Sequence, residues 1–269
     1  MEVGLLGPLL AEEQGVSVVP TAHKPRKVLA LLALHADRIV TVPMLMEEVW
    51  GEAVPRSAST TLQTYILQLR RLLAKALRDD PERQAKDILV TQPGGYLLEV
   101  QPGWSDMSEF NRLVEAGRRA LELGDDRSAS HLLGRGLKLW RGAALVDIQL
   151  GRQLELEVLG LEETRMSALE LRIGADLRLG RHSELVSELR VLTARHPMQE
   201  SLCMQLMLAL YRSGGGSRAL DAFHALRRIL NEELGIEPSM RVQRLHQAML
   251  CGDPALDLQG ESAAERLAV

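Results

Sequence analysis

The sequence predicts an α+β fold: a small domain of strands and helices, residues 1–103, followed by an all-helical domain, residues 104–252. Three observations predict it. Short β-rich runs and a hairpin signature at Pro93-Gly94-Gly95 bracket three helical patterns. After Trp104 only helical periodicity remains. Aromatic residues make up 3% of the chain, so aliphatic side chains must fill the core, which favours helix packing.

The first elements are short strands and a buried helix. Val3–Leu9 and Val16–Val19 read as strands on either side of Gly15. The stretch HKPRKVLALLALHA, residues 23–36, predicts a helix with Pro25 near its first turn. Its middle is almost wholly apolar, so we expect it to be the central helix of the domain core.

The second helix is predicted over TVPMLMEEVWG, residues 41–51. Thr41 can cap its amino end, Pro43 suits the first turn and Gly51 can end it. A loop, residues 51–57, then leads into the third helix.

The third helix, residues 59–78, is amphipathic. Its apolar stripe is Leu62, Ile66, Leu69 and Leu73, at spacings of four, three and four. The chain has 36 acidic and 32 basic residues, yet residues 57–78 contain no acid. An ordinary surface helix mixes both signs, so the pattern indicates an anionic partner. The face opposite the stripe carries Thr60, Thr61, Thr64, Gln68, Arg71, Lys75 and Arg78.

The rest of the chain predicts antiparallel helix pairs that turn at glycine-bearing tracts. The last two turns lie about 34 residues apart, the period of tetratricopeptide repeats. Residues 253–269 read as a small, polar tail. The expected helices are 107–123, 127–139, 153–179, 183–195, 199–212, 217–234 and 239–250.

Three helices followed by a β-hairpin, residues 87–100, form the layout of a winged helix-turn-helix domain. In that layout the third helix enters the major groove, where Thr and Gln can read base edges and Arg and Lys meet phosphates. A solvated cationic helix is the simpler alternative. The hairpin and a second basic cluster, Lys24, Arg26 and Lys27, weigh against that alternative.

The residues also resemble a known family. VLALLALHADRIVTVPMLMEEVWGE, TLQTYILQLRRLL and ILVTQPGGYLLEV are similar to the OmpR-type winged helix of the Streptomyces antibiotic regulatory proteins. LKLWRGAAL, HPMQESLCMQLMLALYRSG and ALDAFHALRRILNEELGIEPS are similar to the bacterial transcriptional activation domain of that family. The resemblance covers nearly the whole chain. It implies a transcriptional activator of an antibiotic biosynthetic cluster.

The resemblance further implies double-stranded DNA with direct repeats near the −35 element, a side-by-side homodimer on that DNA, and RNA polymerase with its sigma subunit as partners. Gln92 stands before the wing turn, where many relatives carry Arg, and Leu67 stands where some relatives carry a cation. The implied DNA-reading positions are Thr61, Gln63, Thr64, Tyr65, Gln68, Arg70 and Arg71, with Gly94, Gly95 and Tyr96 in the wing. The implied polymerase-facing loop is Gly51, Glu52, Ala53, Val54, Pro55, Arg56 and Ser57.

Other function classes lack the residues they need. There is no phosphate-binding P-loop pattern, no metal-ligand spacing and no catalytic constellation, so we expect no enzyme, cofactor or metal site. Cys203 and Cys251 read as reduced thiols. No signal peptide or membrane span is recognisable, and a soluble cytoplasmic protein is expected. The remaining rival is a helical adaptor that does not read DNA; it would not need an acid-free third helix.

Overall fold

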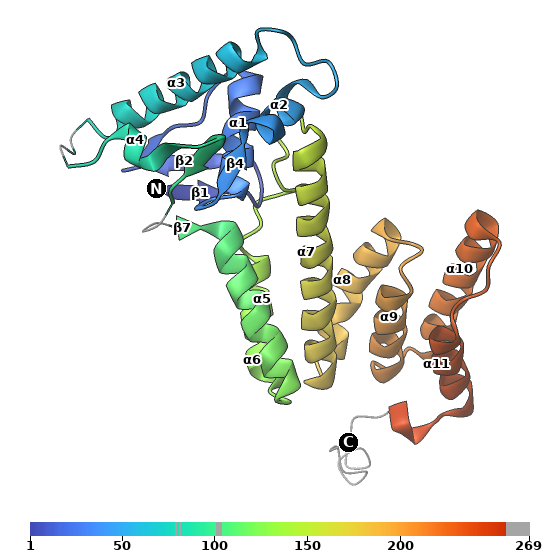
Figure 1. Cartoon of the computed structure of the whole chain (residues 1–269). Helices are drawn as coiled ribbons and strands as arrows, with labels where there is room; N and C mark the ends of the chain where they lie inside the picture. Colours follow the sequence, from blue (N-terminus) through green and yellow to red (C-terminus); the bar gives the residue numbers. More distant parts are fainter. Residues whose placement is uncertain (79, 81, 101–103, 257–269) are drawn as a thin grey trace. The chain divides into compact units, whose positions relative to one another are not determined.

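The structure is a computed structural model that describes residues 1–78, 80, 82–100 and 104–256 (Figure 1). The expected domain boundary at residue 103 and most of the expected tail, 253–269, lie outside the described residues. The chain forms two compact units. The first holds Met1–Glu115 and Arg135–Ser167, and the second holds Ala116–Gly134 and the chain from Ala168 onward. Part of the helical region therefore belongs to the first unit.

The first unit contains a four-stranded sheet of order β3-β2-β1-β7. Neighbouring strands pair antiparallel, except β7, which runs parallel to β1. The prediction of one strand over Val3–Leu9 was wrong, because β1 ends at Gly4 and β2 begins at Leu10. The strands are β1 (Glu2–Gly4), β2 (Leu10–Glu13), β3 (Val16–Ser17) and β7 (Trp104–Ser105).

A buried carboxylate explains why β1 ends there. Asp106 opens helix α5 (Asp106–Glu122) and is 1% exposed. Its oxygens accept the backbone N–H groups of Leu5 at 2.8 Å and Leu6 at 3.0 Å, and Arg141 lies 3.1 Å away. These N–H groups are therefore satisfied by a side chain rather than by a neighbouring strand.

Three helices form the helix-turn-helix core of the first unit: α1 (His23–Leu34), α2 (Val42–Trp50) and α3 (Ala58–Ala76). The middle of α1 is buried throughout, as expected. The predicted ends of α2 are confirmed, because Thr41 Oγ1 accepts from the Met44 N–H at 3.4 Å and Gly51 adopts a φ of 59°. The apolar stripe of α3 is buried, with each leucine and isoleucine about 2% exposed or less.

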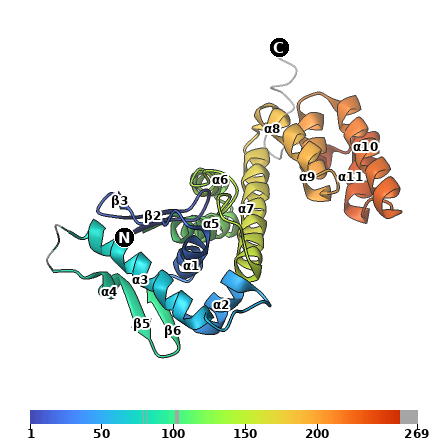
Figure 2. The ribbon, with the colours of Figure 1, turned by 90° about the horizontal axis from the view of Figure 1, so that it is seen from above.

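The predicted hairpin is also confirmed. It comprises β5 (Leu89–Gln92) and β6 (Gly95–Leu98), and together with β4 (Ile39–Thr41) it forms a sheet of order β4-β6-β5. The view from above shows the hairpin beside α3 (Figure 2). Strand β4 and the one-turn helix α4 (Ala85–Ile88) had no recognisable pattern in the sequence.

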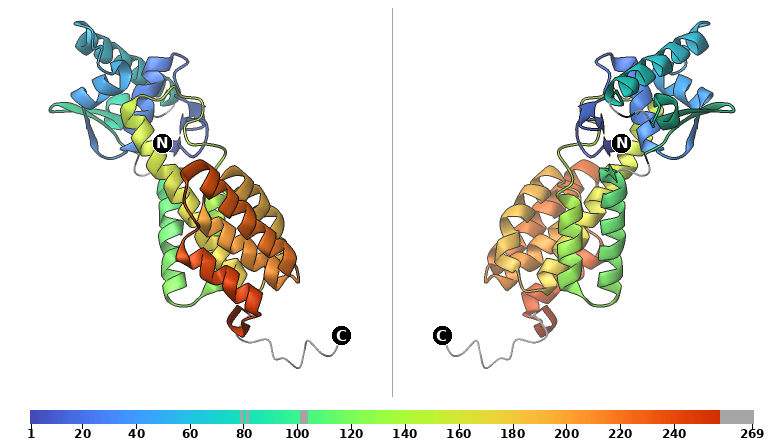
Figure 3. Two further views of the ribbon diagram at one scale, coloured as in Figure 1. Left: turned by 90° about the vertical axis from the view of Figure 1, so that its right-hand side faces the viewer. Right: turned by 90° about the vertical axis from the view of Figure 1, so that its left-hand side faces the viewer.

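The helices after α5 match their expected ranges to within two residues. At the turns between them Gly124, Gly180 and Gly214 have positive φ, the conformation in which glycine has no steric cost. In the second unit α9 packs against both α8 and α10 (Figure 3). No described helix is long and apolar enough to cross a membrane. The helices are α6 (Asp126–Leu137), α7 (Arg152–Arg178), α8 (His182–Arg195), α9 (Glu200–Arg212), α10 (Gly216–Leu234) and α11 (Met240–Cys251).

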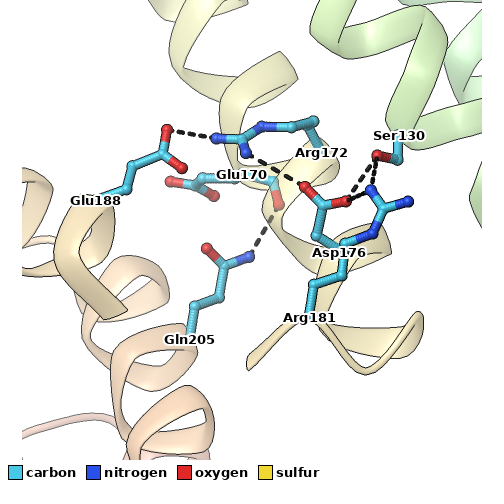
Figure 4. A network of polar contacts seen from close by, with 7 residues as sticks. All are labelled: Ser130, Glu170, Arg172, Asp176, Arg181, Glu188 and Gln205. Carbon is cyan, nitrogen blue, oxygen red and sulfur yellow. Dashed lines mark hydrogen bonds and ion pairs between the residues drawn. The ribbon is translucent and has the colours of Figure 1, made fainter. Parts of the chain in front are cut away.

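A polar network centred on Asp176 joins α6, α7 and α8 in the second unit (Figure 4). Asp176 is 5% exposed and accepts from Ser130 Oγ at 2.6 Å. Its carboxylate also pairs with Arg181 at 2.7 Å and Arg172 at 3.2 Å, and Arg172 reaches Glu188. A buried charge is tolerated only with such partners, so Asp176 fixes how these helices pack.

We expect Asp176→Ala to lower the free energy of unfolding by about 3 kcal/mol, because it leaves Arg172 and the buried Ser130 hydroxyl without their shared acceptor. Urea denaturation followed by circular dichroism measures the change. Asp221→Ala, at an exposed position of α10, is the matched control and should change stability by less than about 0.5 kcal/mol. Equal stability of the two variants would contradict the central role of Asp176.

Candidate nucleic-acid interface

Helix α3 presents a largely polar and cationic surface opposite its buried stripe. We call it the outer face of α3 and define it by the exposed residues between the two ends of the helix. It contains no carboxylate. Its hydroxyl and amide groups lie in the amino-terminal half of the helix and its cations in the carboxy-terminal half. The outer face comprises Ser59, Thr60, Gln63, Thr64, Leu67, Arg71, Ala74 and Lys75. Thr61 and Gln68 lie at its edge and are half-buried.

Two threonine hydroxyls on this helix donate to the helix backbone. Thr61 Oγ1 donates to the Ser57 carbonyl at 2.9 Å, and Thr64 Oγ1 donates to the Thr60 carbonyl at 3.1 Å. Because each proton is used inside the helix, the oxygen lone pairs remain as acceptors. On the outer face, Thr64 is therefore suited to accept from an amino group on a base edge.

The sequence analysis predicted that Arg70 contacts DNA, but its side chain is bound within the first unit. Its Nε and Nη2 donate to the Leu89 carbonyl at 3.0 and 2.7 Å, and Nη2 also donates to Thr91 Oγ1 at 2.7 Å. The guanidinium thus ties α3 to β5 at the base of the hairpin. Arg70 therefore holds the hairpin against the helix, whereas Arg71 is exposed.

The three predicted wing residues, and Gln92 just before them, differ in their exposure and contacts. Gly94 is exposed at the hairpin turn with a φ of 78°, and its carbonyl accepts from the Val42 N–H at 2.9 Å. Gly95 is buried, and a Cβ there would collide with the Val40 carbonyl oxygen, so glycine is required for strand pairing. Gln92 and Tyr96, which are half-buried, remain the side chains available to a ligand.

The basic cluster of α1 is engaged within the first unit. Arg26 donates to the Pro20 carbonyl at 3.1 Å and pairs with Asp147 at 3.3 Å. Burial raises the pKa of the Glu48 carboxyl, and Lys27 lies near enough to that carboxyl to oppose the rise. These contacts engage both side chains within the first unit, and their contact with a nucleic acid stays a prediction.

Lys24 and Tyr65 belong to an aromatic stack on α1, α2 and α3. The ring of Tyr65 stacks on Trp50 with centroids 6.1 Å apart, and Lys24 Nζ lies 5.4 Å from the Trp50 ring centre. Tyr65 therefore fixes the orientation of α3 against α2, a position on the flank of the outer face. A lysine over an aromatic ring is attracted by the ring's negative face.

The loop between α2 and α3 is exposed from Gly51 to Arg56. The loop closes through backbone bonds, because the Ala58 N–H donates to the Pro55 carbonyl at 2.9 Å. Its exposed side chains include Glu52 and Val54, one charged and one apolar, which suits a protein partner more than a nucleic acid.

Two glutamates that the sequence did not single out hold α2 against the first turn of α7. Glu48, 1% exposed, accepts the backbone N–H groups of Gly151 at 2.6 Å and Leu154 at 3.0 Å. Glu47 accepts from Gln153 Nε2 at 2.9 Å. Burial raises the pKa of the Glu48 carboxyl, although the backbone hydrogen bonds and Lys27 oppose that rise. A carboxylate at a helix amino terminus is also favoured by the helix dipole.

Comparison with known proteins gives two matching family models. Residues 105–250 match the bacterial transcriptional activator domain, and residues 17–98 match the domain described as transcriptional regulatory protein, C terminal. Regulatory protein DnrI of Streptomyces peucetius is 52% identical over 260 residues, which cover 97% of this chain and 96% of DnrI. Transcriptional regulator RedD of Streptomyces coelicolor is 37% identical, over 95% of this chain and 72% of RedD.

A solved structure is similar as well. Mycobacterium tuberculosis EmbR, in complex with a low affinity phosphopeptide, has a TM-score of 0.86 and 32% sequence identity. The similarity covers 94% of this chain and 65% of the EmbR chain. The fold expected from the sequence, a winged helix followed by a helical domain, is thereby confirmed.

The contrast between Arg70 and Arg71 gives a testable pair of variants. Arg71→Ala should weaken binding to any duplex and lower the slope of log affinity against log salt by about one, because one phosphate contact is lost. Arg70→Ala should weaken binding without changing that slope, because it loosens the hairpin. Titrations by fluorescence anisotropy at several salt concentrations measure both. If Arg70→Ala lowered the slope as much as Arg71→Ala, its guanidinium would be a phosphate contact.

Proposed function

The chain belongs to the family of Streptomyces antibiotic regulatory proteins, and on that premise we propose that it activates transcription of an antibiotic biosynthetic cluster by binding direct repeats near the −35 element and recruiting RNA polymerase. Members of this family are transcriptional regulators and not enzymes. The observation that carries the proposal is the outer face of α3, which offers acceptors, amides and cations and no carboxylate.

In this proposal the amino-terminal half of α3 contacts the base edges. Gln63 is exposed, and its amide can accept from adenine N6 through the oxygen and donate to adenine N7 through the nitrogen. Thr60 and Thr64 lie within one turn of it. Arg71 and Lys75 then meet the phosphates further along the helix. Gln68 and Tyr65 add contacts with DNA at the edge of the outer face. Gln92 and Tyr96 of the hairpin contact the adjacent sugar-phosphate backbone of the DNA.

In this proposal the loop Gly51–Arg56 contacts RNA polymerase. The loop begins at Gly51, one turn or less after Glu47 and Glu48, which hold α2 against α7, so its starting point is fixed. A held loop loses little conformational freedom on binding a partner. The sigma subunit is the partner that the family resemblance implies for this position.

A side-by-side pair on a direct repeat is proposed because one reading helix covers few base pairs. A single winged helix gains specificity from a small number of base contacts, whereas a dedicated regulator must discriminate its site from a whole genome. A second copy on an adjacent site adds contacts and raises the effective concentration of the first. The rival function, a helical adaptor, has no use for an acid-free outer face.

We expect Glu52→Ala to reduce transcription in vitro at least several-fold while leaving DNA affinity within about twofold, because Glu52 lies in the loop and outside α3. Transcription with purified polymerase and gel shift on the same promoter fragment measure the two quantities. Ser187→Ala, an exposed change on α8, is the control. A parallel fall in both quantities, or a fall in neither, would show that the loop is not a polymerase contact.

The spacing of the repeats tests the proposed function as a whole. Inserting about five base pairs, half a helical turn, between the repeats should abolish cooperative binding and activation, because the two copies then face opposite sides of the DNA. Inserting about ten base pairs should restore part of the binding. Quantitative footprinting and a reporter assay measure the outcome. If the half-turn insertion changed neither, the protein would act as an independent monomer.

A further inference from the structure

An exposed leucine stands in the middle of the outer face of α3. Helix α3 is described in full, and Leu67 is the one leucine on it that is exposed, with 49% of its surface accessible. The other large apolar side chains of α3 form the buried stripe or lie half-buried beside it. Leu67 is therefore not part of the buried stripe of α3.

Helical spacing defines the neighbours of Leu67. Gln63 lies one turn before it, Thr64 three residues before it and Arg71 one turn after it, so all four share one face. Leu67 thus occupies the position between the groups suited to base edges and the first cation suited to phosphate. A side chain in that position meets the floor of the major groove when the helix lies in it.

A protein-docking role fits this neighbourhood poorly. Docking surfaces are contiguous apolar patches, whereas Leu67 is surrounded on the outer face by hydroxyl, amide and guanidinium groups. The major groove offers one apolar feature to an isolated aliphatic side chain, the C5-methyl group of thymine. Polar neighbours with one central apolar group match a groove floor on which a methyl group lies among donors and acceptors.

We propose that Leu67 contacts the 5-methyl group of one thymine in each half-site and selects a T·A pair at that position. The inference rests on the proposed function, since it assigns one base of the site that α3 reads. It adds a specificity residue of apolar character to a helix otherwise suited to polar readout. The other common base in DNA that carries the same methyl group is 5-methylcytosine, which supplies an independent probe.

Uracil scanning tests the proposal without changing the protein. A duplex carrying the binding site, obtained by selection from a random library, is prepared with each thymine replaced singly by deoxyuridine, which removes only the methyl group. Binding of the full chain should fall about three- to fivefold at one thymine per half-site, the loss expected for one methyl-sized apolar contact. Leu67→Ala should bind the thymine and uracil duplexes equally at that position.

A control variant and a base substitution test whether the effect belongs to Leu67 and to the methyl group. Leu123→Ala removes a leucine that is 85% exposed outside α3, and this control should keep the full sensitivity to uracil. Replacing the T·A pair by a C·G pair should weaken binding, and 5-methylcytosine should recover part of the loss for the unchanged chain and none for Leu67→Ala.

The outcomes distinguish a failure of the Leu67 assignment from a failure of the proposed function. If no uracil duplex binds the unchanged chain more weakly, or if Leu67→Ala retains the same loss at the same thymine, Leu67 does not read a methyl group. Preference for the selected site over random duplex would then still support the proposed function. A chain that prefers no sequence at all would contradict both the role of Leu67 and the proposed function.

Discussion

Buried carboxylates bound to backbone N–H groups hold the first unit together. Glu48 accepts from the first turn of α7, and Asp106 accepts from the chain just after β1. Asp147, which is exposed, also accepts from the Leu9 N–H at 2.8 Å and pairs with Arg26. The two buried acids lie where their charge is compensated, because an uncompensated buried carboxylate would cost several kcal/mol. These three acids thus bind the backbone of their own unit, while Arg71 and Lys75 of α3 are exposed.

This arrangement links the two surfaces that the proposed function needs. Arg70 holds the hairpin against α3, so helix and wing present one surface to DNA. The stack of Tyr65 on Trp50 sets α3 against α2, and Glu48 sets α2 against α7. The loop from Gly51 to Arg56 leaves the same α2, so the DNA-reading helix and the loop proposed for polymerase are positioned by one set of contacts.

Local sequence patterns predicted the helices, the hairpin and the apolar stripe of α3, because periodicity, capping residues and turn residues act over a few neighbouring positions. They predicted part of the outer face of α3, namely Thr60, Thr64, Arg71 and Lys75. Helical spacing also placed Thr61 and Gln68 there, which are half-buried, and did not place Gln63 and Leu67 there, which are exposed. They did not separate Arg70 from Arg71, since only the folded chain brings the Leu89 carbonyl to Arg70. For the same reason Gly95 resembled a contact residue until its close approach to Val40 was visible, and the parallel pairing of β7 with β1 had no local signal.

The central claim is that the outer face of α3 meets DNA, and a carboxylate placed there tests it most directly. Thr64→Glu adds one negative charge at an exposed position of that face, and Ser187→Glu adds the same charge at an exposed position of α8. Affinity for the selected duplex and for random duplex is measured for both. The account predicts at least a tenfold loss on both duplexes for Thr64→Glu and less than a twofold change for Ser187→Glu. Unchanged affinity of a folded Thr64→Glu chain would contradict it.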